Sequence, residues 1–146
     1  MSTMVKSSSQ QIGSGRDFEK NPNYHAILKE YSDLSLNVEA GFYALKNGDV
    51  GRAKGFADIA YTSEKTINFA NVASLYEAIA NYYEKKDFRG NLFLIKTNLI
   101  MANKSWEKHK KKFKGDEVTE NLCDVQIFEN EKRINDINYE MMGWEK

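Results

Sequence analysis

The stretch FRGNLFLIKTNLIMANKSW, residues 88–106, decides the fold class because its apolar residues recur at steps of three and four. These residues are Phe88, Leu92, Ile95, Leu99, Ala102 and Trp106. Such spacing places about one apolar side chain per turn on the same face of an α-helix. The stretch therefore predicts a helix that follows Lys86-Asp87 and buries one face.

The N-terminal part of the chain carries the same spacing from Asn21-Pro22 to Asn47-Gly48. Its apolar face consists of Tyr24, Ile27, Leu28, Tyr31, Leu34, Val38, Phe42 and Leu45. Asn is a good N-cap and Pro fits the first helical position, whereas Gly closes helices in the left-handed conformation. We therefore predict one helix of about six turns between these two signals.

Two further helices are predicted between this helix and residue 88. Asp49 caps the first of them, and the short junction Asn47-Gly48-Asp49 is expected to fold it back antiparallel to its predecessor. The next helix begins near Thr62 or Ser63 and runs to about Lys85, with Asn71 interrupting its apolar face. No segment alternates apolar and polar residues in the way that a half-buried strand does.

The last predicted helix follows the break at Lys114-Gly115-Asp116. Its apolar residues are Val118, Leu122, Val125, Phe128, Ile134, Ile137, Met141 and Trp144. Charged residues fill the gap between Phe128 and Ile134, where the helix is expected to be exposed or bent. Packed against its predecessor the helix would close a bundle, and displaced it would expose an apolar face. The fold class is all-α, either a five-helix bundle or a short stack of antiparallel α-hairpins.

Composition and length predict one folded domain. The 146 residues are 41% hydrophobic and 29% charged, as in ordinary globular proteins. Residues 1–20 show no apolar periodicity and are predicted to form a flexible tail, and residues 21–146 a single helical domain. The one cysteine, Cys123, excludes an intramolecular disulfide, and no stretch approaches the ~20 apolar residues of a membrane span. We predict a cytoplasmic protein, with export that uses no cleaved signal peptide left open.

The residue types that most catalytic and metal sites need are scarce or isolated. His25 and His109 are the only histidines, and neither has a second histidine or a carboxylate three or four residues further on. Gly13-Ser14-Gly15 follows no strand and therefore lacks the context of a phosphate-binding loop. We predict no catalytic, cofactor or metal site, and a chain that is not an enzyme.

Small residues surround the first tight junction at regular intervals. They are Gly41, Ala44, Gly48-Asp49, Ala53, Ala57 and Ala60. This spacing resembles that of tetratricopeptide repeats, and the resemblance extends more loosely through Lys86-Asp87 to cover about residues 37–106. The two junctions lie 38 residues apart, from Gly48 to Lys86, against a family period of about 34. The resemblance implies stacked helical hairpins with a protein-binding groove.

Three features indicate where a partner could bind. The chain carries 21 basic and 21 acidic residues, yet Lys104–Lys114 holds six lysines and one acid, and residues 116–131 hold six acids and no base. Antiparallel packing of the last two helices would neutralise both segments, and we favour this intramolecular pairing, or pairing of the charges with a partner, over nucleic-acid binding. Tyrosines cluster at residues 76–83, and Met and Trp stand near the C-terminus. The candidate partner-binding residues are Tyr76, Tyr82, Tyr83, Trp106, Lys108, Lys110, Lys111, Lys112, Met141 and Trp144.

The pattern as a whole favours a protein-interaction module without catalytic activity: an adaptor, a chaperone-like binder or an assembly subunit. Its partner would be another protein or a second copy of the chain. The alternative is a nucleic-acid or anionic-surface binder that uses Lys104–Lys114, where aromatic residues stand between the lysines.

Overall fold

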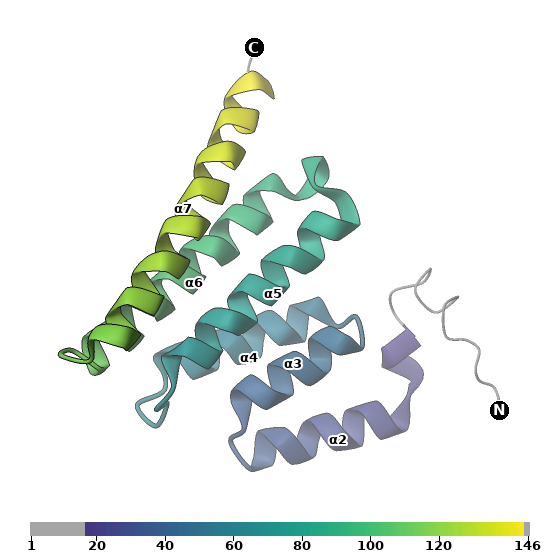
Figure 1. The fold of residues 1–146 in the computed structure, drawn as a ribbon. Coiled ribbons are helices and arrows are strands. Elements are labelled where there is room, and N and C mark those ends of the chain that lie inside the picture. The colour runs from purple at the N-terminus through teal and green to yellow at the C-terminus, as the bar shows by residue number, and fades with distance from the viewer. Residues whose placement is uncertain (1–16, 145–146) are drawn as a thin grey trace. The chain divides into compact units, whose positions relative to one another are not determined.

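The computed structural model describes residues 17–144, and this part of the chain consists of helices joined by turns and short loops, without a strand (Figure 1). Its elements are η1 (Asp17–Lys20), α2 (Pro22–Asp33), α3 (Asn37–Lys46), α4 (Val50–Thr62), α5 (Phe69–Asp87), η2 (Arg89–Asn91), α6 (Leu92–Lys112) and α7 (Glu117–Trp144). The all-α prediction is confirmed, with six α-helices among the described residues where five were expected. Residues 1–16, most of the predicted tail, lie outside the described part.

The chain divides into two compact units, one ending at Ile59 and the other beginning at Ala60. The first contains α2, α3 and most of α4. The second contains α5, α6 and α7. Each unit is described by itself below.

The helix predicted over residues 21–47 is interrupted in the structure and forms two helices, α2 and α3, which accounts for the additional helix. Ser35 adopts a left-handed conformation with φ 59°. The amide of Leu36 donates to the carbonyl of Tyr31 at 2.9 Å, and the amide of Ser35 donates to Ser32 at 2.9 Å. These two bonds close α2 in the manner usually reserved for a glycine. The prediction was wrong because the apolar spacing continues across the break and a serine gives no signal of it.

The turn predicted at Asn47-Gly48-Asp49 is confirmed. Gly48 has a φ of 84°, and the amide of Asp49 donates to the carbonyl of Ala44 at 2.9 Å. The carboxylate of Asp49 is buried, accepts the amide of Arg52 at 3.3 Å, and so caps α4. Its second oxygen accepts the hydroxyl of Tyr24 at 2.8 Å. Burial, strengthened by this bond, raises the pKa of Tyr24 well above its ordinary value. One carboxylate therefore ties α2 to the start of α4.

The third predicted helix begins later than expected. Asn68 caps α5, because its side-chain oxygen accepts the amides of Ala70 at 3.0 Å and Asn71 at 3.4 Å. Ser63, one of the two predicted caps, instead accepts the amide of Lys65 at 3.1 Å and forms a local turn. A serine side chain that bonds to nearby backbone competes with helix formation, which explains the later start.

The second unit is built around α6, which packs against both α5 and α7. The apolar spacing that predicted α6 is confirmed, although residues 89–91 form the separate element η2 before the helix begins. One end of the unit buries Ala80, Leu92, Ile95, Leu99 and Ile137, and the other buries Ala73, Trp106, Cys123 and Ile127. Residues early in α5 thus meet residues late in α6, so the predicted antiparallel hairpin of α5 and α6 is confirmed.

Candidate partner-binding surface

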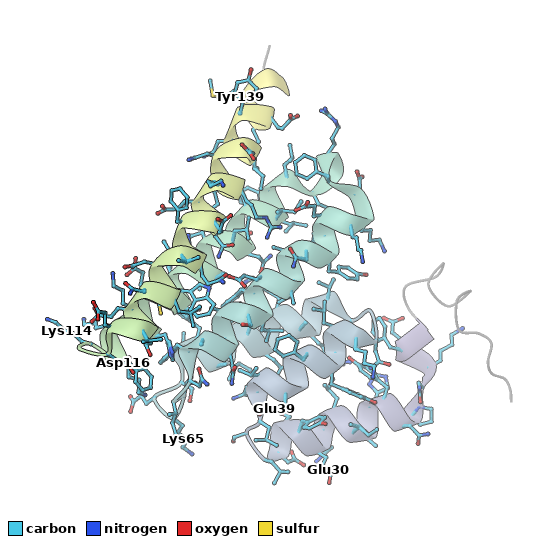
Figure 2. All side chains as sticks on the ribbon, in the orientation of Figure 1. Glu30, Glu39, Lys65, Lys114, Asp116 and Tyr139 are labelled. Carbon is cyan, nitrogen blue, oxygen red and sulfur yellow. The ribbon has the colours of Figure 1, made fainter. Side chains whose placement is uncertain are left out.

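Helix α7 carries two apolar faces, and one of them is exposed. The buried face includes Cys123, Ile127 and Ile137, which lie against α5 and α6. The opposite face exposes 79% of Val118, 50% of Leu122, 55% of Val125 and 59% of Phe128. At ~100° per residue these four side chains share one side of the helix. We call them the outer patch. Figure 2 shows side chains projecting from α7 along its whole length.

A polar network decides which face of α7 is buried. Asn130 is only 3% exposed, and its amide donates to Glu77 of α5 at 2.8 Å and to Asn103 of α6 at 3.0 Å. Asn103 in turn donates to the carbonyl of Ile127 at 3.3 Å. The same carboxylate of Glu77 accepts the indole N–H of Trp106 at 2.7 Å. Glu77 and Asn103 are half-buried, so a rotation of α7 that moved Asn130 away would remove one hydrogen-bond donor from each of them.

The network resolves the two arrangements that the sequence left open for the last helix. Helix α7 packs against α6 and still exposes an apolar face, because its apolar residues belong to two faces. Val118, Leu122, Val125 and Phe128 form one of them, whereas Ile134, Ile137 and Met141 continue the buried one. The side chain of Asn130 bridges the charged gap on the buried side.

Among the described residues, one ion pair joins the basic segment to the acidic segment. Lys110 of α6 donates to Asp124 of α7 at 2.7 Å, which raises the pKa of Lys110. Within residues 17–144, Glu117 and Glu131 take part in no ion pair. The predicted antiparallel packing is therefore confirmed, and it neutralises only part of the acidic segment.

Other lysines of the basic segment are engaged with the end of α4 and with the loop before α5. Lys108 donates to the carbonyl of Tyr61 at 2.9 Å and lies 3.7 Å from the centre of its ring. Lys112 donates to the carbonyl of Thr66 at 3.3 Å. Lys111 is exposed. Of the four predicted lysines, Lys108, Lys110 and Lys112 thus serve contacts inside the second unit.

The three predicted tyrosines of α5 lie in different surroundings. Tyr76 is completely buried, which leaves no surface of its ring for a partner in this structure. Tyr83 is half-buried against the cluster around Leu99, and burial raises the pKa of its hydroxyl. Tyr82 meets it edge-on with ring centres 5.8 Å apart. The structure therefore brings Tyr82 and Tyr83 together and separates them from Tyr76.

The remaining candidates belong mainly to the core. Trp106 is 5% exposed and Met141 is half-buried against the cluster around Ile137. The side chain of Trp144 lies outside the described part of the chain. Further along α7 from the outer patch, Tyr139 is 76% exposed (Figure 2).

Sequence reasoning assigned the outer patch to the apolar pattern of the helix and missed it as a surface. The available signal was Cys123, Ile127 and Asn130, a second line at helical spacing on the opposite side. Within residues 17–144, no three metal-binding side chains gather at one point, and no helix is long and apolar enough to cross a bilayer.

An all-α fold with an exposed apolar helix face defines the class of structure. Comparison of the chain with protein-family models, with curated proteins and with solved structures found no match.

Proposed function

We propose that this chain is a protein-interaction module without catalytic activity, and that the outer patch of α7 is its contact surface. The observation that supports this most directly is the exposure of Val118, Leu122, Val125 and Phe128 side by side. Single apolar residues on a surface need no partner, but a continuous apolar face on a charged helix is typical of an interface.

The spacing of the patch also suits an interface. Val118, Leu122 and Val125 follow one another at steps of four and three, the spacing of a seam between two helices. Removing apolar surface from water is favourable by about 25 cal/mol per Å² of buried area, and this surface is removed only when a partner covers it. A partner would therefore gain free energy by covering the patch without any change in the fold.

The resemblance to tetratricopeptide repeats gives the proposal indirect support. Ala44, Ala53, Ala57 and Ala60 are buried, as the resemblance implies for the first hairpin. The second hairpin buries Asn98 where a small apolar residue would stand. We also propose a cytoplasmic location, since the single cysteine of the chain is free and buried.

The alternative proposal, a nucleic-acid or anionic-surface binder, has weaker support. Lys108, Lys110 and Lys112 are engaged within the second unit, whereas the exposed side chains of Lys104, Lys111 and Lys114 make no contact of this kind within the part of the chain that the structure describes. Salt-sensitive binding to RNA or DNA that is lost when Lys104, Lys111 and Lys114 become Glu would support this alternative.

Site-specific photo-crosslinking tests the interaction module. A photoreactive amino acid replaces Leu122 in the outer patch or, as a matched control, exposed Lys104 of α6, and the full chain is expressed in its native cells. We expect a discrete protein adduct from position 122 that position 104 does not give. The purified adduct partner should bind the unmodified chain and lose binding to the Phe128→Glu variant. Equal labelling from both positions, or binding unaffected by Phe128→Glu, would show that the patch is not the contact surface.

A further inference from the structure

We infer that the outer patch binds a basic amphipathic α-helix of another protein. This inference rests on the proposed function and adds the shape and the charge of the partner. Both follow from the residues on and beside the patch.

The shape of the partner follows from the length and spacing of the outer patch. From Val118 to Phe128 the patch covers ten residue steps, about 15 Å along the helix axis at 1.5 Å per residue. Beyond it the apolar line is interrupted by Glu129 and Lys132, which form an ion pair at 3.8 Å. A partner helix of about three turns matches this length, with apolar residues at the same alternating steps of four and three.

The charge follows from the acids beside the seam. Glu117, Asp124 and Glu131 recur every seven residues and line the border of the patch next to Phe128. Asp124 is paired with Lys110, whereas Glu117 and Glu131 form no ion pair within residues 17–144. No lysine or arginine occurs between residues 116 and 131. The border therefore attracts lysine or arginine on the flank of a partner helix.

The same charges disfavour a second copy of the chain as the occupant. Two outer patches facing each other would bring together Glu117, Asp124 and Glu131 from each copy, over a stretch, residues 116–131, that supplies no base from either. Like charges across a helix pair are unfavourable. The lysines of α6 in a second copy offer little compensation, because Lys110 is already bonded to Asp124 and Lys108 to the carbonyl of Tyr61.

Three synthetic helical peptides test the inference against the full chain. They share one apolar seam of the spacing above and carry Lys, Gln or Glu at every flanking position. Fluorescence anisotropy gives each dissociation constant at low and at moderate salt. We expect the Lys peptide to bind at least about tenfold more tightly than the Glu peptide, since several weak ion pairs add up, with the Gln peptide between them. The advantage of the Lys peptide should shrink as salt rises.

Charge reversal provides the second arm. In the Glu117→Lys, Glu131→Lys double variant we expect the order of the Lys and Glu peptides to reverse, because the border then carries positive charge. Neither glutamate takes part in an ion pair with another of the residues 17–144, so the fold should persist, and circular dichroism checks this. Leu122→Glu should abolish binding of all three peptides, whereas Phe93→Glu on the exposed surface of α6 should leave it unchanged.

The outcomes distinguish failure of the inferred partner, a basic helix, from failure of the proposed interaction module. Equal binding of the three peptides overturns the basic partner and leaves an apolar contact surface. Absence of binding by any peptide, together with a specific adduct at position 122, overturns the helical partner and keeps the module. Absence of both overturns the two proposals together. Concentration-dependent self-association that Leu122→Glu removes would identify a second copy as the occupant and overturn the inference.

Discussion

The two apolar faces of α7 contain the same kinds of residue, but one face is buried and the other is exposed to solvent. Ile127 and Ile137 are at most 9% exposed, whereas Leu122 and Val125 on the other side are at least half exposed. Both faces follow helical spacing. The difference lies in Asn130, which belongs to the buried face and finds hydrogen-bond acceptors on α5 and α6. A polar residue with specific partners thus selects one of two apolar faces for the core.

The largest effect is expected from truncating the buried face. Ile137→Ala removes a side chain that is 2% exposed and packed against Leu92, Ile95 and Leu99. Loss of its burial and the cavity left behind should lower the free energy of unfolding by about 2–5 kcal/mol. Chemical denaturation monitored by circular dichroism measures this. Val125→Ala on the outer patch is the matched control, and a similar loss there would contradict the assignment of the faces.

The next effect concerns the residue that selects the face. Asn130→Ala leaves the carboxylate of Glu77 and the amide oxygen of Asn103 without one donor each. We expect a loss of about 1–3 kcal/mol in the free energy of unfolding. Asn121→Ala, an exposed change on the same helix, should be neutral or slightly stabilising because Ala favours helices. If the two variants unfold alike, the network does not anchor α7.

A smaller, pH-dependent effect is expected on α6. Burial lowers the pKa of His109, and the charge of Lys112 adds to this. His109 then binds a proton less readily in the folded state than in the unfolded state. Its contribution to the free energy of unfolding is therefore fully present above the ordinary pKa of about 6.5 and is lost as pH falls through the pKa of the folded state. Denaturation at several values from about pH 7.5 to about pH 5 should show this decline, and His109→Gln should flatten it. An unchanged slope in the variant would assign the decline to other groups.

The smallest effect on stability is expected from the outer patch itself. Leu122→Gln replaces an exposed apolar side chain with one of similar helix propensity. We expect the free energy of unfolding to stay within about 0.5 kcal/mol of the unmodified chain, while peptide binding falls. Destabilisation as large as that of Ile137→Ala would mean that this face is part of the core.

The sequence predicted the helices well wherever one apolar line and one turn residue agreed. Helix α6 and the turn at Gly48 are examples, because spacing and backbone requirement point to the same boundary. The prediction failed at Ser35, where a left-handed residue is not a glycine. It also failed at the start of α5, where Asn68 caps the helix and the side chain of Ser63 instead accepts the amide of Lys65 in a local turn.

The candidate surface was harder to predict than the fold. Apolar spacing states that a face exists but not whether another helix covers it. For α7 the choice depends on Asn130 meeting Glu77, 53 positions earlier in the chain. A contact of that range leaves no local pattern. The partner-binding candidates drawn from residue type alone therefore include core residues such as Tyr76 and Trp106.

Cys123 stands next to Leu122 in the chain but on the buried side of α7, and it is completely shielded from solvent. Burial also raises the pKa of its thiol, so the reactive thiolate is rare while the helix is docked. The rate at which an alkylating reagent modifies Cys123 therefore reports how often α7 transiently detaches from α5 and α6. A ligand that binds α7 only in its docked position must lower the alkylation rate of Cys123 in proportion to the occupancy of the ligand, even though it does not contact the sulfur.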